Sequence, residues 1–289
     1  MPDRRRRPAP PRRGPATADL PDEEVPTSLG TASVRHEPGA VSLVTLLLNG
    51  TESSCLDLED PAHLEFEYMQ QMAVVLDATR PDGPVRALHL GAAGCALPRA
   101  LEARRPGSTQ LAVELDEVLA GLVRTWFDLP RAPRLRIRTG DARAVTASLP
   151  DGAWEVVVRD VFDSGVVPRH VRTVEAAAEV RRVLTPDGLY LVNLTDHPPL
   201  RQARAEVASL REVFAHVALV ADPAILRGRR YGNVVLAASA GPLAVARLER
   251  DLRRLALPVR LVHGEELTTF RGTVAPDRDL PAAGTGAAT

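Results

Sequence analysis

The sequence predicts an α/β protein in which a doubly wound, Rossmann-like sheet follows a small N-terminal β-hairpin domain. Three observations predict this fold. Strand-like and helix-like segments alternate from residue 84 onward, a glycine-containing loop separates the first of these strands from its helix, and an Asn49-Gly50 turn signal joins two β-prone runs upstream. With 289 residues and 45% hydrophobic content, the chain can bury a full core.

The two ends of the chain lack the apolar residues that a packed segment needs. We expect residues 1–31, which are rich in Arg and Pro, to form a disordered tail, and residues 257–289 to form a C-terminal extension that ends in a second disordered tail. No apolar stretch follows the N-terminal arginines, and no apolar run has the length of a membrane span. Neither export nor a membrane span is therefore expected.

The overall composition argues against several classes of protein. The formal net charge is −1, so nothing in the composition favours a specific nucleic-acid partner. All 36 basic residues are arginine, which is typical of a G+C-rich genome and carries no functional information. The only cysteines, Cys55 and Cys95, lie in unrelated contexts without zinc-type spacing. We expect a cytoplasmic protein without a metal site.

Residues 32–60 are expected to form the hairpin domain. AVSLVTLLLNG is apolar and β-prone up to the Asn49-Gly50 turn signal, and TESSCLDLED alternates beyond it. A hairpin of this size is too small to be stable alone, so we expect it to pair with a neighbouring subunit in a homodimer or homotetramer. A helix is expected next, with Pro61 in its first turn. Its apolar residues have the spacing of one helix face: Leu64, Tyr68, Met72 and Val75.

Residues 61–256 are expected to form the Rossmann-like transferase domain. Helical stretches separate five predicted strands, at residues 85–90, 110–115, 135–139, 154–160 and 188–194. Two later apolar runs, HVALVAD and GNVVLAAS, have no predicted helix between them and should pair antiparallel. Five βα units closed by such a hairpin form a doubly wound sheet, which is the layout of S-adenosylmethionine-dependent transferases.

Small or acidic residues follow three successive strands of this series. HLGAAGCALPRAL supplies Gly91 and Gly94 before a helix, which would let backbone amides approach a ligand. Glu114 ends the second strand, where an acid can accept both hydroxyls of a ribose, and Asp141 follows the third, where it can accept from an adenine amino group. The alternatives are a tight turn, a surface acid and a helix cap. Because these positions occur together at strand ends, we expect a nucleoside site.

Two further carboxylates follow the fourth strand. RDVFDSGVVP places Asp160 and Asp163 three positions apart where a buried strand enters a loop. The carboxyl ends of parallel strands face the crevice in which ligands bind, so both carboxylates could contact a substrate. A helix N-cap or a turn is the alternative, because Asp is common in both.

Taken together, these motifs resemble the spermidine synthase family, especially its divergent branch in G+C-rich bacteria. The resemblance covers about residues 32–240 and rests on LNG in the hairpin, LEFEYMQQM before the sheet, VELDE, GDAR and the D-x-x-D of RDVFD. VELDE and GDAR alone would fit many methyltransferases. The set as a whole is more specific than its parts.

The resemblance implies a role for each acid. Glu114 would hold the ribose and Asp141 the adenine of the donor, which is decarboxylated S-adenosylmethionine. Asp160 would bind the reacting amine and Asp163 the tail of the acceptor, while Tyr68 would line the acceptor pocket. A protonated amine has no lone pair with which to attack, so the carboxylate of Asp160 could take its proton and aim the nitrogen. The expected activity is aminopropyl transfer to a small amine.

Three departures from the family leave both substrates open. The family has an acid at the position of Gly94, and that acid grips the amino group of the donor. Its Gln after the hairpin turn is replaced by Ser53. Its acceptor loop Tyr-Pro-Ser-Gly is replaced by GRRYGN, whose Arg229 and Arg230 either repel a polyamine from inside the pocket, which would suit a carboxylated acceptor, or form a solvated turn. An S-adenosylmethionine-dependent methyltransferase and a nucleoside-binding homologue without turnover are therefore the alternatives.

Overall fold

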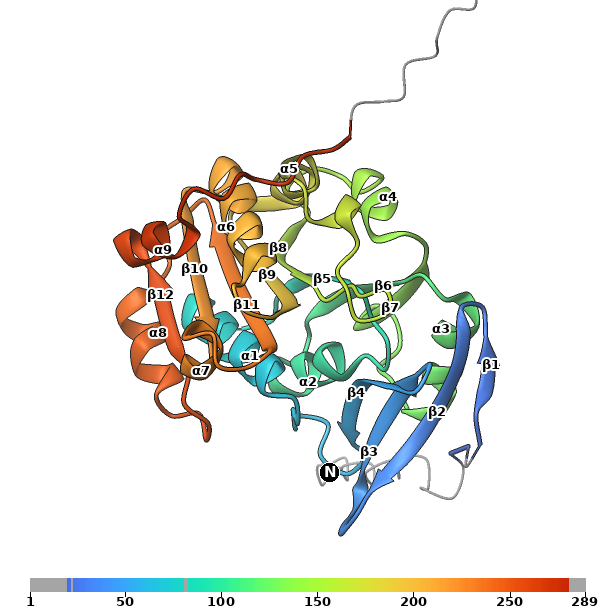
Figure 1. The fold of residues 1–289 in the computed structure, drawn as a ribbon. Coiled ribbons are helices and arrows are strands. Elements are labelled where there is room, and N and C mark those ends of the chain that lie inside the picture. Colours follow the sequence, from blue (N-terminus) through green and yellow to red (C-terminus); the bar gives the residue numbers. More distant parts are fainter. Residues whose placement is uncertain (1–19, 22, 81–82, 281–289) are drawn as a thin grey trace, which may run out of the picture.

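The fold consists of two sheets, which differ in size and in strand direction. The computed structural model describes residues 20–21, 23–80 and 83–280. Within these residues, strands β1–β4 form an antiparallel sheet and strands β5–β12 form a larger one in the order β12-β10-β11-β9-β8-β5-β6-β7 (Figure 1). The expected disorder of residues 1–19 and 281–289 lies outside the described residues.

The strands have the following bounds: β1 (Val25–Thr27), β2 (Gly30–Glu37), β3 (Ala40–Leu48), β4 (Thr51–Asp57), β5 (Arg86–Leu90), β6 (Thr109–Glu114), β7 (Leu135–Thr139), β8 (Trp154–Arg159), β9 (Leu184–Asp196), β10 (His216–Ala221), β11 (Gly232–Ser239) and β12 (Arg260–His263). The helices are α1 (Glu67–Thr79), α2 (Ala96–Arg104), α3 (Glu117–Trp126), α4 (Ala142–Ala147), α5 (Val174–Val183), α6 (Arg201–Val213), α7 (Pro223–Leu226), α8 (Val245–Leu252) and α9 (Gly264–Arg271).

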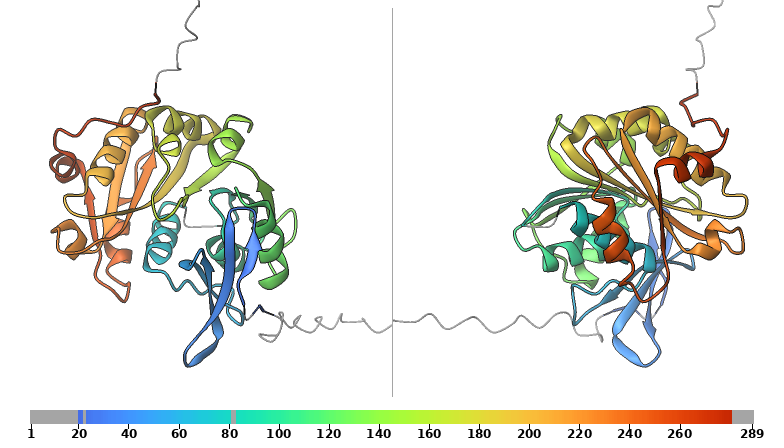
Figure 2. Two further views of the ribbon diagram at one scale, coloured as in Figure 1. Left: turned by 45° about the vertical axis from the view of Figure 1, so that its right-hand side comes forward. Right: turned by 90° about the vertical axis from the view of Figure 1, so that its left-hand side faces the viewer.

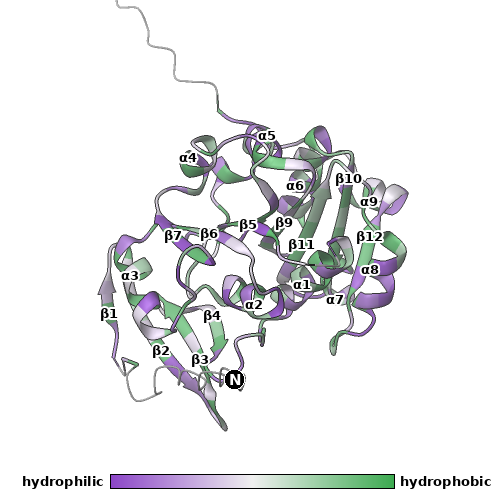
Figure 3. Ribbon diagram, turned by 180° about the vertical axis from the view of Figure 1, so that it is seen from behind, coloured by the Kyte–Doolittle hydropathy of each residue, from purple (hydrophilic) through white to green (hydrophobic). Residues whose placement is uncertain are grey.

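The predicted doubly wound sheet is confirmed. Strands β5 to β9 pair parallel, and the β10–β11 hairpin adds antiparallel through β11 to β9. Successive strand residues alternate between two hydrophobic clusters, with Ala87 in one and Leu88 in the other. Helices α1, α2, α3 and α8 cover the first face, and α4, α5, α6 and α9 cover the second (Figure 2). Strands β10 and β11 consist mostly of hydrophobic residues (Figure 3). Such continuous apolar runs are expected where both faces of a strand are buried.

The N-terminal sheet begins earlier than expected. Strand β1 pairs with β2, so residues 25–31, which were assigned to the disordered tail, are structured. The carboxylate of Asp116 accepts from the backbone N–H groups of Ser28, at 3.0 Å, and Leu29, at 2.9 Å. This segment is therefore held by backbone hydrogen bonds to a residue far along the chain. The shortage of apolar residues in this segment suggested disorder. It carries no information about backbone hydrogen bonds to a distant side chain.

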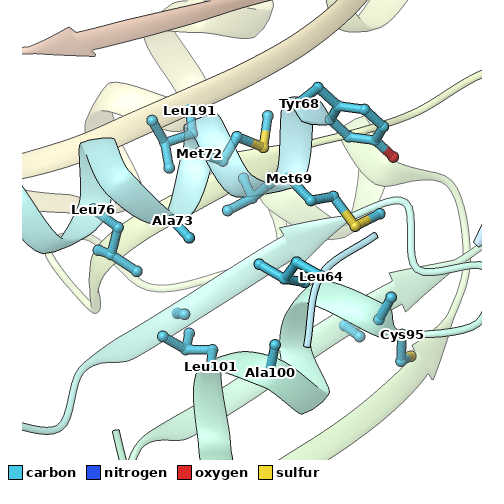
Figure 4. Close-up of a cluster of buried hydrophobic side chains, with 14 of the residues drawn as sticks. Leu64, Tyr68, Met69, Met72, Ala73, Leu76, Cys95, Ala100, Leu101 and Leu191 are labelled. Carbon is cyan, nitrogen blue, oxygen red and sulfur yellow. The ribbon is translucent and has the colours of Figure 1, made fainter. Parts of the chain in front are cut away.

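One face of the N-terminal sheet is buried against the rest of the chain. Ala32, Val34, Val44, Leu46 and Leu56 belong to the same hydrophobic cluster as α1 and α2. Figure 4 shows side chains of α1 and α2 meeting in that cluster. The sheet is thus stabilised within its own chain, and its small size gives no reason for a partner subunit.

Helix α1 begins at Glu67 and not near Pro61. The intervening residues form turns, because Asp57 accepts from two following backbone N–H groups and Asp60 accepts from that of Ala62. A second difference is the short helix α7, which lies between β10 and β11 where no helix was expected.

The C-terminal extension is packed further than expected. Strand β12 pairs antiparallel with β10. The large sheet therefore continues past residue 256, where we expected the Rossmann-like domain to end. Helix α9 packs on the second face of this sheet. Beyond α9, Asp277 pairs with Arg172, and Asp279 pairs with Arg143 at 2.5 Å. The expectation of a disordered C-terminal tail is therefore wrong for residues 275–280. Ion pairs hold residues 277–279 in place. An expectation based on the lack of apolar residues cannot take such pairs into account.

Candidate active site

A cavity of about 1600 Å³ lies between the N-terminal sheet and the carboxyl ends of the parallel strands. It is lined by six of the predicted site residues: Tyr68, Gly91, Glu114, Asp141, Asp160 and Asp163. The fold thus brings together residues that are spread over almost a hundred positions of the chain. This is the place where a doubly wound sheet binds its ligands.

Gly91 lets the loop after β5 pass close to the start of the Asp160 loop. Its φ is +85°, and a Cβ atom there would lie 2.2 Å from the carbonyl oxygen of Asp160. Only glycine fits this position without moving the backbone that carries Asp160.

Gly94 is not among the residues that line the cavity; it packs against the N-terminal sheet. Its backbone N–H donates to Ser54 Oγ at 3.0 Å, and a Cβ atom at Gly94 would lie 2.8 Å from the Cβ of Ser54. An acidic side chain at position 94 would therefore have no room here. No local pattern around Gly94 indicates that Ser54 occupies this space.

Glu114 ties the end of β6 to the loop after β5. Its Oε2 accepts from the backbone N–H groups of Ala92, at 3.3 Å, and Ala93, at 2.9 Å, and its Oε1 accepts from that of Asp116 at 3.0 Å. Carboxylates with backbone donors are well oriented. Whether Glu114 also holds a ribose stays a prediction.

Asp141 is a helix cap that also lies on the cavity wall. Its Oδ1 accepts from the backbone N–H of Ala144 at 2.9 Å and begins α4, while its Oδ2 lies 2.7 Å from His170 Nε2. Burial tends to raise the pKa of Asp141, but the hydrogen bonds from Ala144 and His170 outweigh it, so the pKa is lowered. Asp141 is therefore ionised at neutral pH. His170, which also lines the cavity, was not predicted from the sequence.

Asp160 is held by two hydrogen bonds from opposite sides. Tyr68 Oη donates to its Oδ2 and Asn193 Nδ2 donates to its Oδ1, both at 2.8 Å. In Figure 4 the hydroxyl of Tyr68 points away from the other labelled side chains. Burial raises the pKa of Asp160, and the hydrogen bonds from Asn193 and Tyr68 and the charge of Arg159 oppose that rise. The result is an oriented carboxylate with a raised pKa.

Asn193 is a site residue that the sequence reading missed. It lies in β9 within the run LYLVNL and is 1% exposed. A single amide in an otherwise apolar buried strand was the available signal, since a buried polar side chain needs a partner. Tyr68 was predicted as a pocket residue, but its bond to Asp160 was not.

Asp163 is exposed and forms part of a turn. Its backbone exchanges two hydrogen bonds with Val166, and Ser164 and Gly165 between them have positive φ values of 51° and 80°. A turn, one of the alternatives to a substrate contact, is thus present. The side chain still lines the cavity, where Ser164 Oγ donates to it at 3.1 Å.

Acidic side chains outnumber arginines in the described lining of the cavity by ten to two. The acids are Glu37, Glu52, Glu65, Glu67, Glu114, Asp116, Asp141, Asp160, Asp163 and Asp222, and the arginines are Arg35 and Arg230. Arg230 pairs with Asp222 at 2.5 Å, and Arg229 does not line the cavity. Such a lining attracts cations, so the arginines of GRRYGN give little support to a carboxylated acceptor.

No cluster of three or more His, Cys, Asp or Glu that could hold a metal ion occurs in the described part of the chain. Cys55 and Cys95 are buried free thiols. No described helix combines the length and the apolar character needed to cross a membrane.

The structure defines a Rossmann-like α/β protein with an acidic cavity at the carboxyl ends of its parallel strands. No family model matches the chain. A probable spermidine synthase from Corynebacterium glutamicum ATCC 13032 is 34% identical and has a TM-score of 0.84, over 90% of this chain and 97% of that one. This protein belongs to the spermidine synthase family.

Two further comparisons agree with this family and fold. A polyamine aminopropyltransferase from Vibrio vulnificus (strain CMCP6) is 25% identical over 207 residues, which cover 65% of this chain and 68% of that one. Human methyltransferase-like protein 13, in complex with SAH, has a TM-score of 0.53 and 23% identity over 66% of this chain and 94% of that one. The last likeness concerns the fold alone, so the fold does not distinguish aminopropyl transfer from methyl transfer.

Proposed function

We propose that this protein transfers an aminopropyl group from decarboxylated S-adenosylmethionine to a small amine. The observation that carries the proposal is the carboxylate of Asp160, oriented by Tyr68 and Asn193 on the wall of an acidic cavity. The names of the relatives from Corynebacterium and Vibrio support it. Both substrates are cations, which suits the excess of acidic side chains in the lining.

Aminopropyl transfer requires a base beside the attacking amine. The amine nitrogen attacks the carbon next to the sulfonium, the N–C bond forms as the C–S bond breaks, and sulfur leaves with the bonding electrons in methylthioadenosine. The amine must lose a proton, and Asp160 would accept it. Its raised pKa makes it a stronger base than an exposed Asp.

We assign the carboxylates to a donor side and an acceptor side of the cavity. Glu114 and Asp141 lie at the ends of β6 and β7, where they would hold the ribose and adenine of the donor. Tyr68 and Asp163 lie on the side of Asp160 and would bind the acceptor. Glu114 can accept two ribose hydroxyls only if its bonds to the backbone N–H groups of the loop after β5 are shared or exchanged.

Methyl transfer from S-adenosylmethionine is the second candidate, and Gly94 favours it. Position 94 offers no acid for the amino group of a decarboxylated donor, and Ser54 fills the space that an acid would need. A donor site without that acid would discriminate less between the two donors. The third candidate, a nucleoside-binding homologue without turnover, has no specific observation in its favour.

Calorimetry with the two donors, followed by product analysis with a panel of amines, separates these functions. We expect tighter binding of decarboxylated S-adenosylmethionine and the formation of methylthioadenosine with a diamine. Formation of S-adenosylhomocysteine would instead identify a methyltransferase. Binding without any thioether product, over every donor and amine pair, would indicate the homologue without turnover.

Asp163→Asn is expected to raise the KM for the amine more than it lowers turnover. An exposed carboxylate attracts a cationic acceptor equally in the ground and transition states, and the loss is worth about 2- to 5-fold. Steady-state kinetics at low ionic strength would measure it. A variant with unchanged KM would leave Asp163 as a turn residue only.

We also propose a homodimer or homotetramer, although the N-terminal sheet does not require it for stability. Two exposed apolar side chains of this sheet, Leu29 in the β1–β2 turn and Val41 in β3, at 59% and 74% exposure, would be covered by a second copy. Sedimentation at micromolar concentration is expected to show an oligomer. A monomer there would exclude both assemblies at that concentration.

A further inference from the structure

Arg159 is the largest fully buried side chain among the described residues, and it lies directly before Asp160. Neighbouring strand residues point to opposite faces, so Asp160 meets Tyr68 of α1 while Arg159 points toward α6. There its Nη1 lies 2.5 Å from Oε1 of Glu206, and the two side chains are 0% and 2% exposed. A buried ion pair therefore lies beneath the candidate base.

The same guanidinium also holds two backbone carbonyls. Its Nη1 donates to the carbonyl oxygen of Val171 at 3.2 Å, and its Nη2 donates to that of Asn193 at 3.3 Å. Asn193 is the residue whose side chain donates to Asp160, and Val171 ends the turn that follows the Asp163 loop. One buried cation thus ties together both segments that flank Asp160.

Stability alone does not explain a charge at this place. Removing two ions from water is costly, and apolar residues of similar volume often replace such a pair without loss. Here Nε of Arg159 and Oε2 of Glu206 also lack hydrogen-bond partners among the described residues. The pair is incompletely satisfied, so it is a poor source of stability.

We propose that the Arg159–Glu206 pair is a positioning unit, which keeps the Asp160 carboxylate in its reacting orientation by fixing the backbone at Asn193 and Val171. The inference rests on the proposed function, because it assigns a task to residues that do not touch the substrate. The guanidinium is suited to the task, since its rigid fork can reach both carbonyls and the carboxylate at once.

The charges around the pair determine the expected pH effect. Arg159 lies beside Asp160 and lowers the pKa of its carboxyl, in opposition to burial. Tyr190, Arg172 and Asp277 are the other charged or titratable groups that face the pair. Loss of the guanidinium should therefore move the titration of Asp160 to higher pH.

The test uses the full-length protein and two readouts. The first is turnover with the decarboxylated donor and a diamine, and the second is an NMR titration of ¹³C-labelled aspartate carboxyls without substrate, assigned with Asp160→Asn. In the double variant Arg159→Met/Glu206→Leu we expect turnover to fall about 10- to 100-fold and the Asp160 titration to move to higher pH. Arg159→Lys keeps the charge but loses the fork, so turnover should fall while the titration moves less.

Arg105→Met is the matched control. Arg105 is also a buried arginine, paired with Asp77 at 2.7 Å and donating to the carbonyl oxygen of Gly83 at 3.2 Å, but it does not line the cavity. This variant should lose stability without changing either readout. Wild-type turnover and an unmoved titration in the double variant would overturn the proposal. If the double variant does not fold, normal turnover in Arg159→Lys would overturn it.

Failure of the proposed function gives a different pattern. If the wild-type protein forms no product with any donor and amine, aminopropyl transfer is wrong. A shifted Asp160 titration in the double variant would then still support the positioning unit, and an unshifted one would overturn it.

Discussion

Replacing Asp160 with asparagine is expected to lower turnover by about 10²- to 10⁴-fold and to leave donor affinity nearly unchanged. Asparagine keeps the shape of the side chain and can still accept from Asn193 and donate to Tyr68. It cannot accept the proton of the amine. The measurement is single-turnover kinetics with saturating donor, together with donor binding by calorimetry.

The melting temperature of Asp160→Asn serves as the control for correct folding. The pKa of Asp160 is raised above its ordinary value of 3.8 mainly by burial, so the stability linked to this group is present below that value and is lost as pH rises through the folded pKa. Above the folded pKa the ionised carboxylate thus costs stability, and Asp160→Asn should melt no lower than the wild type there. Near-normal turnover in this variant across the pH range would show that Asp160 is not the base.

Tyr68→Phe is expected to change how turnover depends on pH. The hydrogen bond from Tyr68 lowers the pKa of Asp160, so its removal should raise that pKa further. Because the ionised carboxylate is the active form, the acidic limb of the rate profile should move to higher pH.

Glu114→Ala is expected to weaken nucleoside binding by about 1.5–3 kcal/mol, which is roughly 10- to 150-fold in Kd. The variant would lose a charge-assisted contact to the ribose. It would also free the backbone N–H groups of Ala92 and Ala93 and loosen the loop after β5. Calorimetry with methylthioadenosine measures the effect.

Two further variants separate these contributions. Glu117→Ala removes an exposed acid three residues on that does not line the cavity, so its affinity should equal that of the wild type. Glu114→Gln keeps one carbonyl oxygen that can accept from the loop after β5. Its nucleoside affinity should lie between that of Glu114→Ala and that of the wild type. Equal affinity in Glu114→Ala and Glu117→Ala would remove Glu114 from the nucleoside site.

The strands of the large sheet could be predicted because each is a short apolar run between turn residues. The third of them was predicted at residues 135–139 and has those bounds in the structure. Strand β1 could not be predicted in this way, since hydrogen bonds to Asp116, 87 and 88 positions away, hold the turn beside it. Local patterns report on burial along one segment and not on such bonds.

The succession of strands along the chain and the acids at their ends could be predicted from local patterns, because apolar periodicity and strand-end position are local properties. Only the tertiary structure decided which partners those acids have. Tyr68 reaches Asp160 across 92 positions and Asn193 across 33. Ser54 occupies the space beside Gly94, across 40 positions. A side chain buried beside another loses its water, so its charge and orientation depend on neighbours that only the folded chain brings together.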